Sequence, residues 1–421
     1  MESIFKSNYF KGFVLILSFL LLWARREDIL MNAQFWAEDA VFWYKDAYQN
    51  GFLNSLLTPR NGYFQTVSTL IVGTTSYLNP LYAPLVSNFF GILLRAVVVW
   101  FIFTERFSFL NMTTRVFISA YFFCMPGVQE VHANITNAHW YLSLYVSMII
   151  IAIKPETIGW KVHDIFFIIL SGLSGPFIIF ILASTIFKYY NENKANINIR
   201  SFFKFYTAQT YLTMIFCAAI QISTILLTFE GSRSSAPLGF SIDVMSSIIS
   251  SNVFLFTFFP WNIASYGWDN KLLSVLVNIG FISAVFYAFI KGNWQVRIFA
   301  TLPLLIFVFS MAKPQLTDSM PQLPTLVNGE GQRYFVNIHI AIYSLLITAI
   351  FNTIKNSAFQ TYITLVFSTL TAFMFSMNFF ISPLPDMNWK DGATMINDAK
   401  PGDKISFRVV PPRLVLELIK K

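Results

Sequence analysis

Two adjacent carboxylates, Glu38 and Asp39, are the first side chains in the sequence whose types suggest chemistry. They lie in an aromatic-rich stretch, residues 35–51, that directly follows the first apolar segment. In helical form, one face of this stretch would carry Trp36, Ala40, Trp43, Tyr44, Ala47 and Tyr48. Such a helix is expected to lie in the membrane interface, where Trp and Tyr rings are favoured. The carboxylates either stabilise its first turn through the helix dipole or supply a catalytic acid at the water–lipid boundary.

A second group of polar side chains interrupts an otherwise apolar part of the chain. It consists of Glu130, His132, Asn134, Asn137, His139 and Trp140. Glu130 and the two histidines are possible ligands for a divalent metal, but the spacing of His132 and His139 matches no strong zinc pattern. Asn134, Asn137 and His139 are better suited to bind the hydroxyl groups of a sugar, or they cap the two flanking helix ends.

A third candidate is Arg333, which is followed by Tyr334 at the start of an apolar segment. Its side chain either snorkels from the end of a membrane span or clamps a phosphate, which a planar guanidinium can contact through two hydrogen bonds. Arg60, in a Pro- and Gly-containing turn, is a possible second phosphate ligand. The sequence has no Gly-rich phosphate loop, no serine nucleophile elbow and no CxxC pair, so hydrolytic and redox enzymes are disfavoured.

The elements that position these groups must be mostly membrane helices. Hydrophobic residues make up 55% and charged residues 12% of the 421 residues, and the mean hydropathy is +0.57. Such a chain is expected to be an all-α polytopic membrane protein. The net charge of +8 indicates membrane topology and not nucleic-acid binding, because no basic run with interleaved polar residues occurs.

The charged loops predict how the chain crosses the membrane. Lys6 and Lys11 precede the first apolar segment, which places the N-terminus in the cytoplasm. The same rule predicts roughly nine crossings, at residues 9–23, 81–104, 116–127, 141–153, 205–229, 272–290, 298–311, 336–351 and 362–381. Residues 64–78 and 252–268 are expected to insert partly or to lie flat.

Residues 165–187 are predicted to form a hairpin and not a tenth crossing. Their centre contains Ser174-Gly175-Pro176, which interrupts a helix. A single crossing would place Lys188 and Lys194 outside, against the usual charge bias. Because broken helices are tolerated where they line a polar cavity, the break is expected to face the site.

The chain is predicted to divide into a transmembrane domain, residues 1–381, and a short tail outside the cytoplasm, residues 382–421. Within the tail, residues 405–410 and 414–419 are predicted to form two short strands around Pro411-Pro412. On this topology Glu38 and Asp39, the stretch from Glu130 to Trp140, and Arg333 all lie on the outer side of the membrane.

This order of features resembles that of the GT-C class of membrane glycosyltransferases, and within it the serotype-converting O-antigen glucosyltransferases of bacterial inner membranes. The resemblance covers the whole chain in layout. Its motifs are Trp36-Ala37-Glu38-Asp39, Asn134-Ile135-Thr136-Asn137-Ala138-His139-Trp140, Leu173-Ser174-Gly175-Pro176 and Arg333-Tyr334-Phe335. The chain departs from the aminoarabinose transferases, because Ser174 stands where they tend to carry a lysine.

The resemblance implies a GT-C-like helical bundle in a bacterial inner membrane, with the C-terminus and the active site in the periplasm. It implies transfer of a hexose, expected to be glucose, from a polyprenyl-phosphate donor to a lipid-linked O-antigen or another surface glycan, with inversion at C1. Such a reaction needs a carboxylate base and a group that stabilises the departing phosphate. Asp39 is the first candidate for the base and Glu38 the second.

The remaining expectations concern binding. Arg333, Arg60 and Tyr334 are expected to hold the donor phosphate, and no cofactor is expected apart from the metal alternative. The expected substrate-binding residues are Trp36, Glu130, His132, Asn134, Asn137, His139, Trp140 and Ser174.

Two other functions compete with the transferase. A flippase or transporter of a lipid-linked or amphiphilic substrate would also use broken helices and intramembrane polar groups, but the sequence has no duplicated halves. A membrane acyltransferase would require a His–Asp type pair on the side of its donor.

Overall fold

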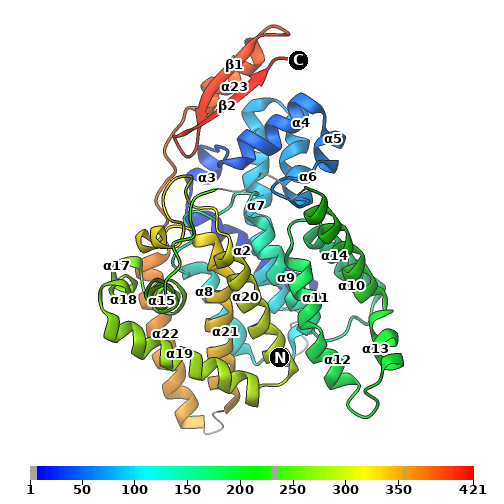
Figure 1. The fold of residues 1–421 in the computed structure, drawn as a ribbon, viewed down its shortest axis with the longest axis vertical. Coiled ribbons are helices and arrows are strands. Elements are labelled where there is room, and N and C mark those ends of the chain that lie inside the picture. Colours follow the sequence, from blue (N-terminus) through cyan, green and yellow to red (C-terminus); the bar gives the residue numbers. More distant parts are fainter. Residues whose placement is uncertain (1–6, 229–234, 354–356) are drawn as a thin grey trace.

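The computed structural model describes residues 7–228, 235–353 and 357–421, and these residues are mostly helical (Figure 1). Within these described residues, six helices are long and apolar enough to cross a membrane. They are α7 (Ala83–Ile102), α14 (Gln209–Thr228), α19 (Lys271–Lys291), α20 (Trp294–Ala312), α21 (Val336–Thr353) and α22 (Ser357–Asn378). The chain is therefore a multi-pass membrane protein. Six of the nine predicted crossings fall on these helices. Residue 229, the end of the predicted crossing 205–229, and Lys6, used above to orient the first crossing, lie outside the described residues.

The other three predicted crossings fall on helices that are shorter than these six. These are α2 (Asn8–Ala24), α8 (Met112–Cys124) and α9 (Ala138–Ile151). Further short helices are α3 (Asp28–Met31), α5 (Phe52–Leu57), α6 (Thr66–Thr74), α13 (Ile199–Tyr206), α15 (Ile242–Ser247), α16 (Phe256–Phe258), α17 (Trp261–Ala264) and α18 (Tyr266–Asp269). A π-helical segment, Ile248–Leu255, joins α15 to α16. Residues 64–78 therefore contain only a helix too short to span a bilayer. Residues 252–258 are instead the end of a longer apolar helix, Ile242–Phe258, and α17 and α18 follow it.

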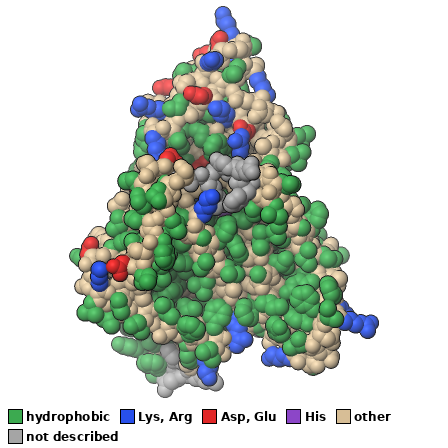
Figure 2. Space-filling model, viewed as in Figure 1, with side chains coloured by type: hydrophobic (Ala, Val, Ile, Leu, Met, Phe, Trp, Pro, Cys, Tyr) green, Lys and Arg blue, Asp and Glu red, His purple; other side chains and the backbone are tan. Residues whose placement is uncertain are grey.

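The outer surface of the bundle has the character that lipid contact requires. Only 11% of the most apolar part of α19 and 17% of that of α22 is buried inside the protein. Hydrophobic side chains cover the flank of the bundle, whereas charged side chains gather on the C-terminal unit and at the opposite end (Figure 2). Apolar surface of this extent is stable in a hydrocarbon environment and not in water.

The segment around Gly175 forms a hairpin of two short helical arms. The ascending arm is α10 (Ile158–Gly172), and the descending arm is α11 (Phe177–Ser184) followed by α12 (Ile186–Glu192). Gly175 has a φ of +115° in the turn, a value that only glycine adopts without strain. Both arms contact the chain near the C-terminal end of α9. In the descending arm, Lys188 donates to the Ile150 carbonyl (3.0 Å). In the ascending arm, Asp164 pairs with Arg106, and Arg106 donates to the Ile153 carbonyl.

Buried arginines tie the helix ends together through backbone carbonyls. Arg25 donates to the carbonyls of Phe122 and Met125 at the end of α8, and to those of Asn378 and Phe379 at the end of α22. Helix C-termini present unpaired carbonyls and a partial negative charge, so a guanidinium is a suitable partner for them. The ends of α2, α8 and α22 therefore meet around one cation.

Residues 382–421 form a folded unit on top of the bundle (Figure 1). It contains α23 (Trp389–Asp398) and an antiparallel hairpin of β1 (Lys404–Val409) and β2 (Leu414–Ile419), paired from Lys404 opposite Ile419 to Val409 opposite Leu414. The two predicted strands are confirmed to within one residue. The helix α23 was not predicted.

The aromatic stretch is shorter as a helix than predicted, and protein covers its apolar face. A π-helical segment (Asp39–Tyr44) leads into α4 (Lys45–Asn50), whereas Trp36 pairs with Val410 and Ala37 has a φ of +41°. Tyr44 is fully buried, and its ring lies 6.1 Å from that of Trp389. The prediction that this face lies in the membrane interface is therefore wrong, because the C-terminal unit occupies the place expected for lipid.

Candidate functional site

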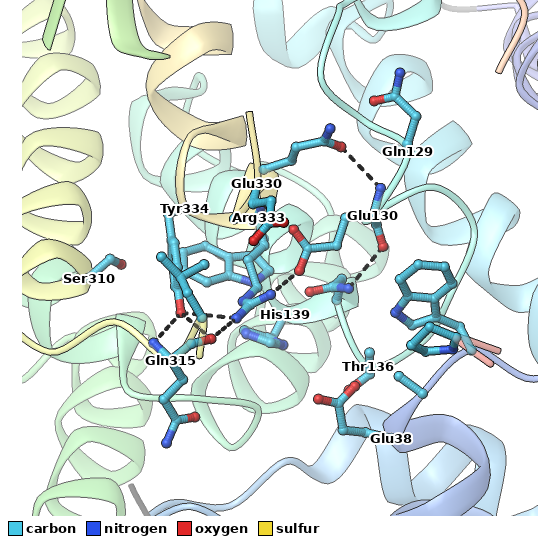
Figure 3. Close-up of a pocket in the computed structure, with 18 of the residues that line it drawn as sticks. Glu38, Gln129, Glu130, Thr136, His139, Ser310, Gln315, Glu330, Arg333 and Tyr334 are labelled. Atoms are coloured by element: carbon cyan, nitrogen blue, oxygen red, sulfur yellow. Dashed lines mark hydrogen bonds and ion pairs between the residues drawn. The ribbon is translucent and has the colours of Figure 1, made fainter. Parts of the chain in front are cut away.

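A cavity of about 980 Å³ lies between the C-terminal unit and the bundle. Of the residues singled out in the sequence, it is lined by Trp36, Glu38, Glu130, Asn137, His139, Trp140, Arg333 and Tyr334. Figure 3 shows Glu38 and Arg333 approaching this space from different segments, with Glu130, Thr136 and His139 between them. Glu38, part of the Asn–His segment and Arg333 thus line one cavity, whereas Asp39, His132 and Asn134 do not line it.

The two adjacent carboxylates occupy different environments. Glu38 lines the cavity and is half-buried, whereas Asp39 is fully buried and does not line it. The Asp39 carboxylate accepts hydrogen bonds from the backbone N–H groups of Ile135 (3.0 Å) and Thr136 (2.8 Å). Burial raises the pKa of Asp39 to about 8, against the opposite effect of these N–H groups. Asp39 thus supports the segment that carries Thr136, and Glu38 is the carboxylate that a substrate would meet.

The segment from Glu130 to Asn137 is held in shape by its own amides. Asn134 and Asn137 both donate to the Glu130 carbonyl (2.7 and 3.3 Å), and the Asn134 side-chain oxygen accepts from the Asn137 backbone N–H (3.1 Å). Arg95 of α7 donates to the carbonyls of Val131 and Asn134 from below. Asn134 therefore shapes the segment without lining the cavity, whereas Asn137 does both.

The two histidines of this segment differ in the same way. His139 lies in the first turn of α9, lines the cavity and stacks on Phe177 with ring centroids 5.5 Å apart. His132 is buried away from the cavity, and burial together with the charge of Arg25 lowers its pKa well below the usual value. A neutral, buried His132 has no access to a substrate in the cavity.

Arg333 is presented by a short turn in which Gly329 and Gly331 have φ values of +71° and +65°. Its guanidinium forms an ion pair with the Glu130 carboxylate and donates to the Gln315 carbonyl and to the Tyr334 hydroxyl (3.1 Å). Burial opposes the charge, but Glu130 and, more weakly, Glu38 raise the Arg333 pKa above its usual value. The arginine is therefore a permanent cation facing the cavity.

Two predicted binding residues take structural roles outside the cavity. Ser174 lies in the helix break, where its hydroxyl accepts from the Val67 N–H (2.8 Å) and donates to the Leu170 carbonyl. Arg60 forms an ion pair with Asp46, and neither Arg60 nor Ser174 lines the cavity. The residues that bring the broken helix to the site are instead Pro176 and Phe177.

Within the described residues, no group of three or more His, Cys, Asp or Glu side chains is arranged to hold a metal ion. Glu130, His132 and His139 do not gather, because Glu130 pairs with Arg333 and His132 points away from the cavity. These three side chains are therefore not arranged around one point as the ligands of a single metal ion would be.

Several lining residues were not predicted. They include Arg26, Gln129, Lys313, Gln315 and Glu330, and the strand-connecting residues Pro411, Pro412 and Arg413. Arg26 is held by the carbonyls of Ser382 (2.9 Å) and Gln129 (3.2 Å), so it joins the start of the tail to the polar segment. The Pro-Pro pair marked a turn in the sequence, but its place over the cavity depends on the docking of the tail.

The sequence matches no known protein-family model, and no curated protein matches it at a significant level. The fold and the cavity therefore carry the argument for function. They establish a multi-pass membrane protein in which a carboxylate, a histidine and an arginine from three distant segments line one cavity beside the apolar bundle.

Proposed function

We propose that this chain is a membrane glycosyltransferase of the GT-C type, which transfers a hexose from a polyprenyl-phosphate carrier to a hydroxyl of a glycan outside the cytoplasm. The observation that carries the proposal is that Glu38 and Arg333 line the same cavity. A carboxylate and a fixed cation are the two groups that sugar transfer from a phosphate requires.

In the proposed reaction, the acceptor oxygen attacks C1 of the hexose while the bond from C1 to the phosphate oxygen breaks. Glu38 takes the proton of the acceptor hydroxyl, and Arg333 holds the departing phosphate with the help of the Tyr334 hydroxyl. Glu38 replaces Asp39 as the first candidate for the base, because Asp39 is enclosed by the backbone of Ile135 and Thr136. With a single carboxylate acting as base, the expected outcome is inversion at C1.

The lining of the cavity suits a donor with a lipid tail. On the bundle side it is formed by Pro176 and Phe177 at the helix break and by Phe309 near the end of α20. Trp36, Asn137 and His139 also line the cavity and offer an aromatic face and polar groups of the kind that bind sugar rings and hydroxyls. A polyprenyl phosphate supplies its own membrane anchor and leaving group, so the proposal needs no nucleotide site.

The distribution of basic residues supports a cavity on the outer side of a bacterial inner membrane. Helix α9 runs from His139 at the cavity to Ile150 at the other end of the bundle, where Lys188 and Arg106 lie. Helix α20 starts near the same end, because Lys188 lies 5.1 Å from the ring of Trp294. Because basic residues at the ends of membrane helices favour the cytoplasmic side, we propose that the N-terminus lies inside and the C-terminal unit in the periplasm.

Transfer of radiolabel tests the proposal directly. Purified protein in lipid nanodiscs would be incubated with labelled polyprenyl-phosphate hexoses, glucose first, and with a lipid-linked O-antigen acceptor. Label in the glycan supports the transferase. In sealed vesicles, label that changes leaflet without entering the glycan would support a flippase instead, and label that stays on the donor in its original leaflet would exclude both.

A further inference from the structure

The ion pair between Arg333 and Glu130 occupies the position in which Arg333 would hold a phosphate. The Glu130 carboxylate contacts both the guanidinium and, at 3.4 Å, the backbone N–H of Arg333. The guanidinium uses Nη1 for Glu130, and its Nη2 donates to the Gln315 carbonyl and to the Tyr334 hydroxyl. A carboxylate and a phosphate compete for the same donors, because both accept paired hydrogen bonds from a planar guanidinium.

We infer that Glu130 is an exchangeable counter-ion, which a phosphate group must displace from Arg333 before it can bind. In this account Glu130 sets the affinity of the cavity for phosphate without touching the sugar. The identity of the natural phosphate, a polyprenyl-phosphate sugar, rests on the proposed function, but the exchange itself requires only an anion of this class.

The Glu130 side chain can leave Arg333 without disturbing the segment to which it belongs. That segment is held by main-chain atoms of Glu130: its N–H donates to the Gln332 side chain (3.1 Å), and its carbonyl accepts from Asn134 and Asn137. Within the described residues, the only ion-pair partner of the carboxylate is Arg333. Displacement of the carboxylate therefore costs one ion pair and the long hydrogen bond from the Arg333 N–H, and it leaves the main-chain contacts of the segment in place.

The exposure of the pair also favours exchange. The side chains of Arg333 and Glu130 are 26% and 20% exposed, and both line the cavity. A displaced carboxylate would therefore reach the solvent of the cavity, where hydration compensates for the lost partner. This distinguishes the pair from Arg106–Asp164 at the other end of the bundle, in which both side chains are 3% exposed and a displaced charge would have no solvent to enter.

The test is the affinity for phosphate of a Glu130→Gln variant, with Glu330→Gln as a matched control. Glu330 lines the same cavity three residues from Arg333, and within the described residues its side chain has no ion pair or hydrogen bond. Calorimetry on purified protein in detergent would use two probes, inorganic phosphate and farnesyl phosphate. We expect Glu130→Gln to bind both probes about tenfold more tightly, because the charged competitor for the guanidinium is removed. We expect Glu330→Gln to bind them as the wild type does.

Three outcomes would overturn the inference. Unchanged or weaker binding by Glu130→Gln would show that Glu130 orients Arg333 and does not compete with the ligand. An equal gain in Glu330→Gln would show a general effect of charge. Tight binding that survives Arg333→Ala in the Glu130→Gln background would place the phosphate elsewhere.

The same variants separate this inference from the proposed function. If wild-type protein transfers sugar but Glu130→Gln has an unchanged or higher KM for the donor, the transferase stands and the counter-ion role fails. If Glu130→Gln binds farnesyl phosphate more tightly but no variant transfers sugar, the counter-ion role stands and the transferase fails. A preference for farnesyl phosphate over inorganic phosphate would identify a lipid-linked ligand.

Discussion

Replacing Asp39 by Ala should destabilise the protein, whereas replacing its neighbour Glu38 by Gln should stop transfer and leave stability almost unchanged. The two carboxylates are adjacent in sequence, but Asp39 is fully buried and Glu38 lines the cavity. Asp39→Ala leaves the backbone N–H groups of Ile135 and Thr136 without an acceptor in a buried place. The pair of substitutions therefore separates support of the site from chemistry within it.

The magnitude follows from the number of lost acceptors. Each buried N–H without a partner costs about 1 to 3 kcal/mol, so Asp39→Ala should lower the free energy of unfolding by about 2 to 6 kcal/mol. Asp39→Asn keeps one oxygen that can accept, so it should lose about half of that amount. Glu38→Gln removes a half-exposed charge, and loss of a general base lowers kcat by about 10² to 10⁴-fold.

The assay combines thermal unfolding in detergent with single-turnover transfer from the labelled donor. The expected order of unfolding temperature is wild type and Glu38→Gln, then Asp39→Asn, then Asp39→Ala. Our reasoning would be refuted by an Asp39→Ala protein that melts with the wild type and has no activity, because Asp39 would then be the chemical group. Full activity of Glu38→Gln would equally remove Glu38 as the base.

Three further predictions follow from the structure. Arg333→Lys keeps the charge but loses the planar pair of donors, so the KM for the donor should rise about tenfold or more; an unchanged KM would remove Arg333 from the phosphate site. Burial raises the pKa of Asp39 from 3.8 to about 8, so the stability due to its protonated form is complete below about pH 4 and is lost as the pH rises through 8. The unfolding temperature of the wild type should therefore fall over this interval. An equally steep fall in Asp39→Asn would contradict the assignment. Trp389→Ala removes a buried ring packed 4.9 Å from that of Phe35 and should cost about 3 to 5 kcal/mol, seen as proteolysis of the C-terminal unit before the bundle; resistance equal to that of the wild type would show that Trp389 does not hold the unit in place.

Much of the bundle could be predicted because its signals are local. Length and hydropathy located the long helices, and the positive charges around residues 165–187, together with Gly175-Pro176, indicated a hairpin. The alternation of apolar residues and the Pro-Pro turn located β1 and β2 to within one residue. Each of these features depends on neighbours within one turn or one span, which a single sequence contains.

The errors concern contacts between distant segments. The apolar face of the aromatic stretch can be seen in the sequence, but no local signal tells whether lipid or protein covers this face. In the structure the C-terminal unit, some 350 residues away, covers it, for example through Trp389 against Phe35. Helix α23 is short and polar, with an apolar face that only the docked unit explains. The bounds of the aromatic helix were wrong because Trp36 pairs with Val410 instead of continuing the helix.

The candidate site was predicted by residue type better than by role. Glu38, Asn137, His139 and Arg333 line the cavity as expected, whereas Asp39 and Ser174 bind backbone groups around it. Asp39 and Glu38 are equivalent to a reader of the sequence, since both are carboxylates at a helix start. Only the approach of the Ile135–Thr136 backbone, about 96 residues later in the chain, distinguishes the two.

The most direct test of the account is a cryo-electron microscopy structure with a non-hydrolysable polyprenyl-phosphate hexose analogue. We predict the phosphate within hydrogen-bonding distance of Arg333, with Glu130 turned away, and the hexose on the side of Glu38. Density for the phosphate outside the cavity, or at the end of the bundle that carries Lys188, would contradict the central claim.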